Sequence, residues 1–158
     1  METKEIENSP NEGESTEEIN NDFEILPNDT PRYDHRYKII IIGDSGVGKT
    51  CLSVKITTGK FNDKNQPTLG FDYSPLFLKH KKYDKILKLE LWDTCGQEAY
   101  RALIKSFFAN SSLAIIVYAI NDQNSFNSIE EWVRQCKAEC SPNTKILLIG
   151  SKKDLENE

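Results

Sequence analysis

Apolar and polar positions alternate along the chain in blocks that predict strands and helices in turn. Residues 37–42 form an apolar run typical of a buried parallel strand, and residues 49–58 predict a helix that ends at Gly59. Residues 73–80 and 86–93 predict a β-hairpin around a charged turn. Pro75 cannot donate a ladder hydrogen bond, so we expect its strand at a sheet edge.

The second half of the chain continues this alternation. Residues 100–109 predict a short helix, 113–120 a buried strand, 125–140 an amphipathic helix with Ser125 as its N-cap, and 145–150 a last apolar strand. This order of elements predicts a three-layer α/β domain with a mostly parallel sheet. The expected apolar face of the long helix consists of Phe126, Ile129, Val133 and Cys136/Lys137.

Charge divides the chain near residue 30. Residues 1–30 hold ten Asp or Glu and one Lys, whereas residues 31–158 hold fifteen acids and nineteen Lys or Arg. The first stretch has too little apolar surface to order itself, so we expect residues 1–35 to form a disordered acidic tail and residues 36–158 to form the domain. A partner-binding acidic arm is the alternative. The domain lacks a dense basic stripe, so no nucleic-acid partner is expected.

The cysteines and the termini indicate the compartment. Cys51, Cys95, Cys136 and Cys140 form no C-x-x-C pair, which argues against zinc and favours a reduced cytoplasmic location. The acidic N-terminus is no signal peptide, and the longest apolar run, residues 113–120, is too short to cross a bilayer.

Residues 43–50, Gly-Asp-Ser-Gly-Val-Gly-Lys-Thr, carry the strongest chemical signal. They fit the motif G-x-x-x-x-G-K-S/T between a predicted strand and a predicted helix, where backbone N–H groups and the helix N-terminus cradle phosphates. We expect Lys49 to bind phosphate and assist catalysis, and Thr50 to ligate Mg²⁺. A glycine-rich turn that matches by chance is the alternative. The nucleotide contacts expected in this region are Asp44, Ser45, Gly46, Val47, Gly48, Lys49, Thr50 and Cys51.

A second motif, Asp93-Thr94-Cys95-Gly96-Gln97, stands where a predicted strand ends. Ligands bind beyond the carboxyl ends of parallel strands, so Asp93 is suited to hold Mg²⁺ through a water. The backbone of Gly96 would approach a γ-phosphate, and Gln97 would orient an attacking water. An ordinary turn that closes a strand is the alternative.

These motifs resemble the Ras superfamily of small GTPases, most closely its Rab branch. The resemblance covers residues 36–155 and is strongest over 43–52 and 92–103. It implies a Ras-like P-loop NTPase domain that binds GTP or GDP with Mg²⁺, hydrolyses GTP slowly, and acts as a switch in vesicle trafficking. Effectors, exchange factors and GTPase-activating proteins are the implied partners.

The resemblance also implies roles for aromatic and switch residues. Phe61 matches the side chain that packs on the guanine ring, and Thr68 matches the switch threonine that ligates Mg²⁺ and senses the γ-phosphate. Tyr73, Trp92 and Phe107 match the aromatic triad that Rab proteins present to effectors. Ordinary core packing is the alternative for each of these three.

Guanine recognition is implied by Ser151, Lys152 and Asp154, which occupy the family motif N-K-x-D. A carboxylate at 154 accepts two hydrogen bonds from guanine, which adenine does not offer on that edge. Ser151 replaces the usual Asn with a shorter group, so we expect weaker nucleotide affinity with the guanine preference kept.

The last departure concerns the C-terminal end. The sequence stops at Glu158, before the family's base loop, last strand, last helix and terminal cysteines. We therefore expect a domain without that strand and helix. Membrane association, at the cytosolic face of an endomembrane, would require a prenylated C-terminus beyond Glu158. The alternative function is a non-catalytic or weakly nucleotide-binding interaction module, a pseudo-GTPase.

Overall fold

The computed structural model describes residues 22–61, 68, 70–95 and 107–155. Its strands are β1 (Phe23–Leu26), β2 (His35–Ile42), β3 (Phe71–His80), β4 (Lys85–Thr94), β5 (Leu113–Ala119) and β6 (Lys145–Ser151). Its helices are α2 (Lys49–Thr58), α4 (Gln123–Asn127), α5 (Ile129–Glu139) and the short 3-10 helix η2 (Lys153–Leu155). Most of the helix predicted at 100–109 lies outside the described residues.

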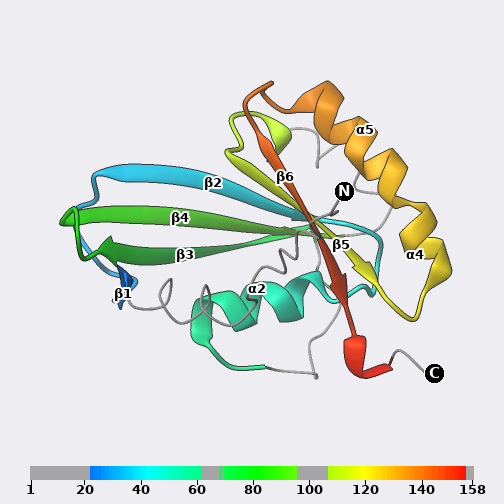
Figure 1. The fold of residues 1–158 in the computed structure, drawn as a ribbon, viewed down its shortest axis with the longest axis horizontal. Coiled ribbons are helices and arrows are strands. Elements are labelled where there is room, and N and C mark those ends of the chain that lie inside the picture. Colours follow the sequence, from blue (N-terminus) through cyan, green and yellow to red (C-terminus); the bar gives the residue numbers. More distant parts are fainter. Residues whose placement is uncertain (1–21, 62–67, 69, 96–106, 156–158) are drawn as a thin grey trace, which may run out of the picture.

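The six strands form one sheet in the order β1-β3-β4-β2-β5-β6 (Figure 1). β2 runs parallel to β4 and β5, and β5 runs parallel to β6. β3 runs antiparallel to both β4 and β1. The predicted mostly parallel sheet is therefore confirmed, and the carboxyl ends of β2, β4, β5 and β6 lie at one edge, where α/β sheets bind ligands.

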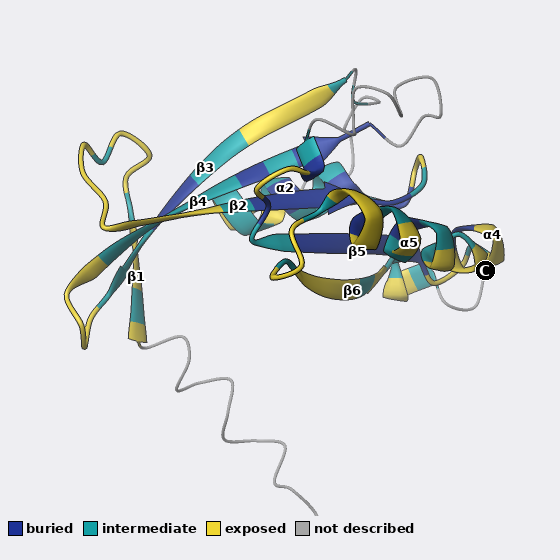
Figure 2. Cartoon of the chain, turned by 90° about the horizontal axis from the view of Figure 1, so that it is seen from above, coloured by how far each residue is buried: buried dark blue, intermediate teal, exposed yellow. Residues whose placement is uncertain are grey.

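The core lies on both faces of β2, because successive side chains of a strand point to opposite sides. Ile39 and Ile41 pack in a cluster covered by α2, whereas Ile40 and Ile42 pack in a cluster that contains Trp132 of α5. Figure 2 shows the buried residues gathered on the parallel strands. With α2 on one side and α4 and α5 on the other, the three-layer prediction is confirmed (Figure 1).

Strand β1 corrects two predictions. The sequence predicts disorder over residues 1–35, but Phe23–Leu26 pairs with Phe77–His80 of β3. The Phe23 ring packs on His80 with ring centroids 4.7 Å apart, which buries part of this apolar side chain. The same pairing means that β3 is not an edge strand over its second half. Pro75 lies outside the pairing with β1. At Pro75, β3 is therefore still an edge strand, as a residue without a backbone N–H requires.

The helix predicted over residues 125–140 is two helices, α4 and α5, with Ser128 between them. Asp122, rather than Ser125, caps α4, since its carboxylate accepts a hydrogen bond from the backbone N–H of Asn124 at 3.0 Å. Ser125 is buried, and its hydroxyl accepts from the backbone N–H of Ala119 at 3.0 Å. The predicted apolar face is also wrong in part, because Phe126 is 50% exposed.

No helix in the described ranges combines the length and the apolar character that crossing a membrane would require.

Candidate functional site

The phosphate-binding motif forms the turn between β2 and α2. Gly43 has φ 140°, and a Cβ atom there would lie 2.1 Å from the carbonyl oxygen of Val117. Only glycine fits such a close approach to the backbone of β5. Gly48, with φ 93°, is the N-cap of α2 and supplies no side-chain acceptor to the first turn. The N–H groups at this helix start are therefore not occupied by a capping side chain.

Lys49 lies buried beneath this loop, with 5% of its surface exposed. Its Nζ donates to the carbonyl oxygen of Asp44 at 2.6 Å, so the side chain turns back along the loop. Burial lowers the pKa of Lys49, and the charge of Asp93 opposes that shift most strongly. A buried ammonium group in this position is suited to bind an anion that enters the loop.

The three predicted metal ligands, Thr50, Thr68 and Asp93, meet beside Lys49. The Thr50 hydroxyl lies 2.7 Å from the hydroxyl of Thr68 and donates to Oδ2 of Asp93 at 2.5 Å. Asp93 is 1% exposed, and its Oδ1 has no hydrogen-bond partner among the described residues. A buried carboxylate oxygen without a donor, next to two hydroxyl oxygens, is a set of hard ligands that fits Mg²⁺.

The electrostatics of Asp93 agree with this fit. Burial raises the pKa of Asp93, and the hydrogen bond from Thr50 and the charge of Lys49 oppose that rise. A buried carboxylate gains from a nearby cation, and a water held by the metal ion would donate the hydrogen bond that Oδ1 lacks. The described residues hold no group of three His, Cys, Asp or Glu side chains that could bind a metal ion, so at this site only Asp93 supplies a charged ligand.

Ser151 connects the end of β6 to the phosphate-binding loop. Its hydroxyl oxygen lies 2.5 Å from the carbonyl oxygen of Val47 and 2.9 Å from that of Tyr118, and its single proton can be donated to either. Ser151 thus braces the loop from 104 positions away in the sequence. Lys152 follows with φ 58°, and Asp154 lies exposed in η2, where its carboxylate is open to a ligand.

The other predicted contacts differ in their placement. Ser45 and Gly46 are exposed in the loop, and Cys51 lies half-buried in the first turn of α2. Phe61 is 70% exposed beyond the end of α2, so its ring is available to a ligand but is not held against the loop. Gly96 and Gln97 lie outside the described residues.

Four aromatic side chains form a surface cluster on β3, β4 and the segment before β5. Ring centroids lie 5.0 Å apart for Tyr73 and Trp92, 5.3 Å for Trp92 and Phe107, and 4.6 Å for Phe107 and Phe71. Phe71 and Tyr73 are 49% and 37% exposed, so core packing does not account for them. Sequence reasoning missed Phe71, although its spacing of two from Tyr73 places both on one face of β3.

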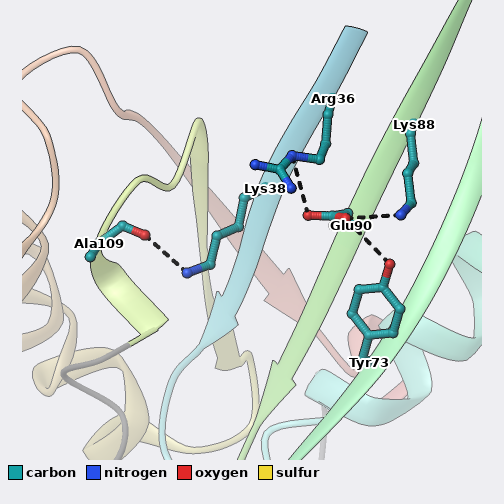
Figure 3. A network of polar contacts seen from close by, with 6 residues as sticks. All are labelled: Arg36, Lys38, Tyr73, Lys88, Glu90 and Ala109. Atoms are coloured by element: carbon teal, nitrogen blue, oxygen red, sulfur yellow. Dashed lines mark hydrogen bonds and ion pairs between the residues drawn. The ribbon is translucent and has the colours of Figure 1, made fainter. Parts of the chain in front are cut away.

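A polar network lies beside this aromatic cluster (Figure 3). The Glu90 carboxylate accepts from the Tyr73 hydroxyl at 3.4 Å and pairs with Lys88 at 3.0 Å. Lys38 donates to the carbonyl oxygen of Ala109 at 2.9 Å, and its Nζ lies 5.6 Å from the centre of the Trp92 ring. This face therefore combines exposed aromatic rings with charged groups, as protein interfaces do.

Known proteins are similar in sequence to this chain over most of its length. The sequence model of the Ras family matches residues 38–158. The chain is 38% identical over 126 residues to GTP-binding protein YPTM2 of Zea mays, a match that covers 79% of this chain and 61% of that protein. It is 39% identical over 127 residues to Ras-related protein Rab-11B of Dictyostelium discoideum, covering 80% and 57%.

Ras-related protein Rab-13 of Mesocricetus auratus is 37% identical over 124 residues, covering 78% of this chain and 60% of that protein. The chain thus spans about 60% of the length of these relatives. Because the family match extends over more than half of the chain and includes the loop, Asp93 and Ser151, this protein belongs to the Ras family and resembles its Rab and Ypt members.

Proposed function

We propose that this chain is a GTP-binding switch that hydrolyses GTP to GDP and acts in vesicle trafficking. The observation that carries the proposal is the meeting of Thr50, Thr68 and Asp93 beside the buried ammonium group of Lys49. These residues come from α2, the segment before β3 and the end of β4. Membership of the Ras family supports a guanine nucleotide as the ligand.

The phosphates would lie against residues 43–50. Backbone N–H groups from Asp44 to Gly48 and the start of α2 would face them, and Lys49 would offset their negative charge. Thr50 and Thr68 would ligate Mg²⁺, and Asp93 would hold it through a water. The ion, when bound, neutralises charge on the β- and γ-phosphate oxygens. Gln97 would orient the attacking water.

The guanine base would lie at the carboxyl end of β6. Asp154 would accept its two hydrogen bonds, while Phe61 and Lys152 would pack on its faces. The short hydroxyl of Ser151 contacts the loop at the carbonyl oxygen of Val47. The family usually has the longer amide side chain of Asn at this position. Because serine can make only part of the contacts that Asn makes, we expect weaker nucleotide binding. The same substitution favours the alternative function, a pseudo-GTPase.

The switch would work through Thr68. Loss of the γ-phosphate removes a ligand to which Thr68 responds, and the segment that leads into β3 carries the change to the aromatic cluster. Effectors would bind that cluster, and exchange factors and GTPase-activating proteins would act on the bound nucleotide. The protein would function in the cytoplasm, or at the cytosolic face of an endomembrane if a prenylated segment follows Glu158.

Nucleotide binding is tested by titrating the 158-residue chain with fluorescent GDP in Mg²⁺ and then adding EDTA. We expect binding that excess GTP, but not ATP, reverses, and release that accelerates at least about tenfold on metal removal, since a lost contact to a charged group costs about 1.5–3 kcal/mol. Asp93→Asn should abolish most of this metal dependence. Asp84→Asn, at the exposed hairpin turn, is the control and should retain it. Release that does not respond to EDTA would contradict the metal site.

Hydrolysis is tested by single-turnover kinetics with GTP. We expect slow turnover, because enzymes of the Ras type reach their full rate only when an activating protein supplies an arginine. Gln97→Leu should slow hydrolysis further without weakening GTP binding. An unchanged rate would remove Gln97 from the mechanism. A chain that binds GDP without any turnover would support the pseudo-GTPase alternative.

A further inference from the structure

A hydrogen bond connects helix α5 directly to the phosphate-binding loop. The indole Nε1 of Trp132 donates to Oδ1 of Asp44 at 2.8 Å, between residues 88 positions apart in the sequence. We infer that Trp132 and Asp44 form a latch that positions the phosphate-binding loop and slows nucleotide release. This inference rests on the nucleotide binding proposed above and assigns positioning residues for it.

Trp132 is a fixed anchor for such a latch. It is 5% exposed and packs in the cluster that includes Ile40, Ile42, Phe108 and Cys136. A buried indole needs a partner for its N–H group, and here that partner comes from the loop rather than from the core. Packing in the core holds the Trp132 ring, while its Nε1 contacts Asp44 in the phosphate-binding loop.

Asp44 is held from two sides. Its side chain accepts from Trp132, and its backbone carbonyl oxygen accepts from Nζ of Lys49 at 2.6 Å. Farther along the loop, Val47 accepts from Ser151. Between these contacts lies Gly46, with φ 76° and no atom near the position of a Cβ. The loop is thus attached to α5 at one end and to β6 at the other, with an unsupported glycine between.

The charge of Asp44 makes the latch specific. A carboxylate in a phosphate-binding loop repels an anionic ligand, and a donor that holds it away from the ligand and offsets part of its charge reduces that repulsion. The bond from Trp132 is charge-assisted, and it keeps the carboxylate engaged on the side of α5. Losing the donor should therefore harm nucleotide binding more than losing the whole carboxylate.

The test measures release of fluorescent GDP from the 158-residue chain in Mg²⁺. Trp132→Phe should accelerate release about tenfold, the equivalent of one lost hydrogen bond to a charged group. Asp44→Ala should accelerate it less, and Asp44→Asn, which keeps an acceptor, should release more slowly than Asp44→Ala. The double variant should release no faster than Asp44→Ala, because the indole then has no carboxylate to hold.

Cys136→Ala is the matched control, since Cys136 packs in the same cluster one helical turn later. It should lower the melting temperature while changing release by less than about twofold. Indole N–H exchange measured by NMR on the nucleotide-free chain tests the bond itself, and it should be faster in Asp44→Ala than in the wild type.

Three results would overturn the latch. These are equal acceleration by Trp132→Phe and Cys136→Ala, additive effects in the double variant, and release rates of Asp44→Ala and Asp44→Asn that match the wild type. The Asp44 variants keep the test decisive if Trp132→Phe does not fold. A wild-type chain that binds no GDP would overturn the proposed function and the latch together, whereas the other results leave the function standing.

Discussion

Gly43 shows how the absence of one methyl group sets the geometry of the site. Its φ of 140° and the 2.1 Å separation between a Cβ atom at this position and the Val117 oxygen leave no room for a side chain. Gly46 also has a positive φ, 76°, but faces open space. Position 43 therefore requires glycine because two backbones approach closely there. Position 46 favours glycine only because of its left-handed conformation.

This difference gives a prediction about stability. Gly43→Ala should lower the free energy of unfolding by roughly 3 kcal/mol or more, because the backbone of β5 must move. Gly46→Ala should lower it by about 1 kcal/mol, the strain of a left-handed residue alone. Urea unfolding of both variants without nucleotide measures the two losses. Similar losses at the two positions would contradict the role assigned to Val117.

Cys136 provides a prediction about pH. Burial, with a smaller effect of Cys140, raises the pKa of its thiol from 9.0 to about 12. Above pH 9 the unfolded chain loses this proton while the folded chain keeps it, so the stability that the buried thiol contributes falls as pH rises toward 12. The difference in unfolding free energy between the wild type and Cys136→Ala should shrink over this range in urea titrations. A difference that stays constant with pH would refute this.

Among the elements, β1 depends on a few contacts. Phe23 packs on His80 with ring centroids 4.7 Å apart, whereas Ile25 is 69% exposed. Phe23→Ala should therefore cost about 1–2 kcal/mol of unfolding free energy, and Ile25→Ala less than about 0.5 kcal/mol. Hydrogen exchange at residues 77–80 should accelerate in the first variant only. Equal exchange in both would mean that the backbone ladder, not the ring, holds β1.

The strands and helices that the sequence predicts correctly have local signals. Residues 39–42 are a run of isoleucines, and α2 follows a loop motif of fixed spacing. β1 has no such signal, since it is four residues long, contains Glu24, and pairs with residues more than 50 positions later. The role of Ser125 also escapes local rules, because its hydroxyl accepts from the backbone N–H of Ala119 in β5 instead of capping a helix.

The candidate site also contains some features that local sequence signals predict and others that depend on distant packing. Residues 43–50 are predictable because their conformation depends on their own glycines, and Asp93 because it ends a strand. The contact between Trp132 and Asp44 is not predictable, since it depends on how α5 is rotated after the break at Ser128. The roles of Gly96 and Gln97 remain predictions from the family pattern.

For the whole molecule, the site is assembled from distant parts of the sheet. Thr50 comes from the start of α2, Asp93 from the end of β4 and Ser151 from the end of β6. A ligand that contacts all three would hold these parts together and would bind only the folded chain. Nucleotide binding should therefore appear as global stabilisation.

Thermal unfolding checks this expectation. GDP with Mg²⁺ at about a thousand times its dissociation constant should add about 4 kcal/mol to the unfolding free energy and raise the melting temperature. ATP at the same concentration should have little effect, and EDTA should remove much of the gain. A melting temperature that is the same with and without GDP would argue against a nucleotide site that spans the sheet.

The central position of β2 also has a consequence for biosynthesis. Its partners are β4 and β5, which the ribosome makes long after Ile39–Ile42, so four isoleucines emerge with nothing to cover them. An apolar, β-prone segment that is exposed in this way is a risk for aggregation during translation. Because Gly43 rests on Val117, the nucleotide site itself cannot form until that valine has left the ribosome.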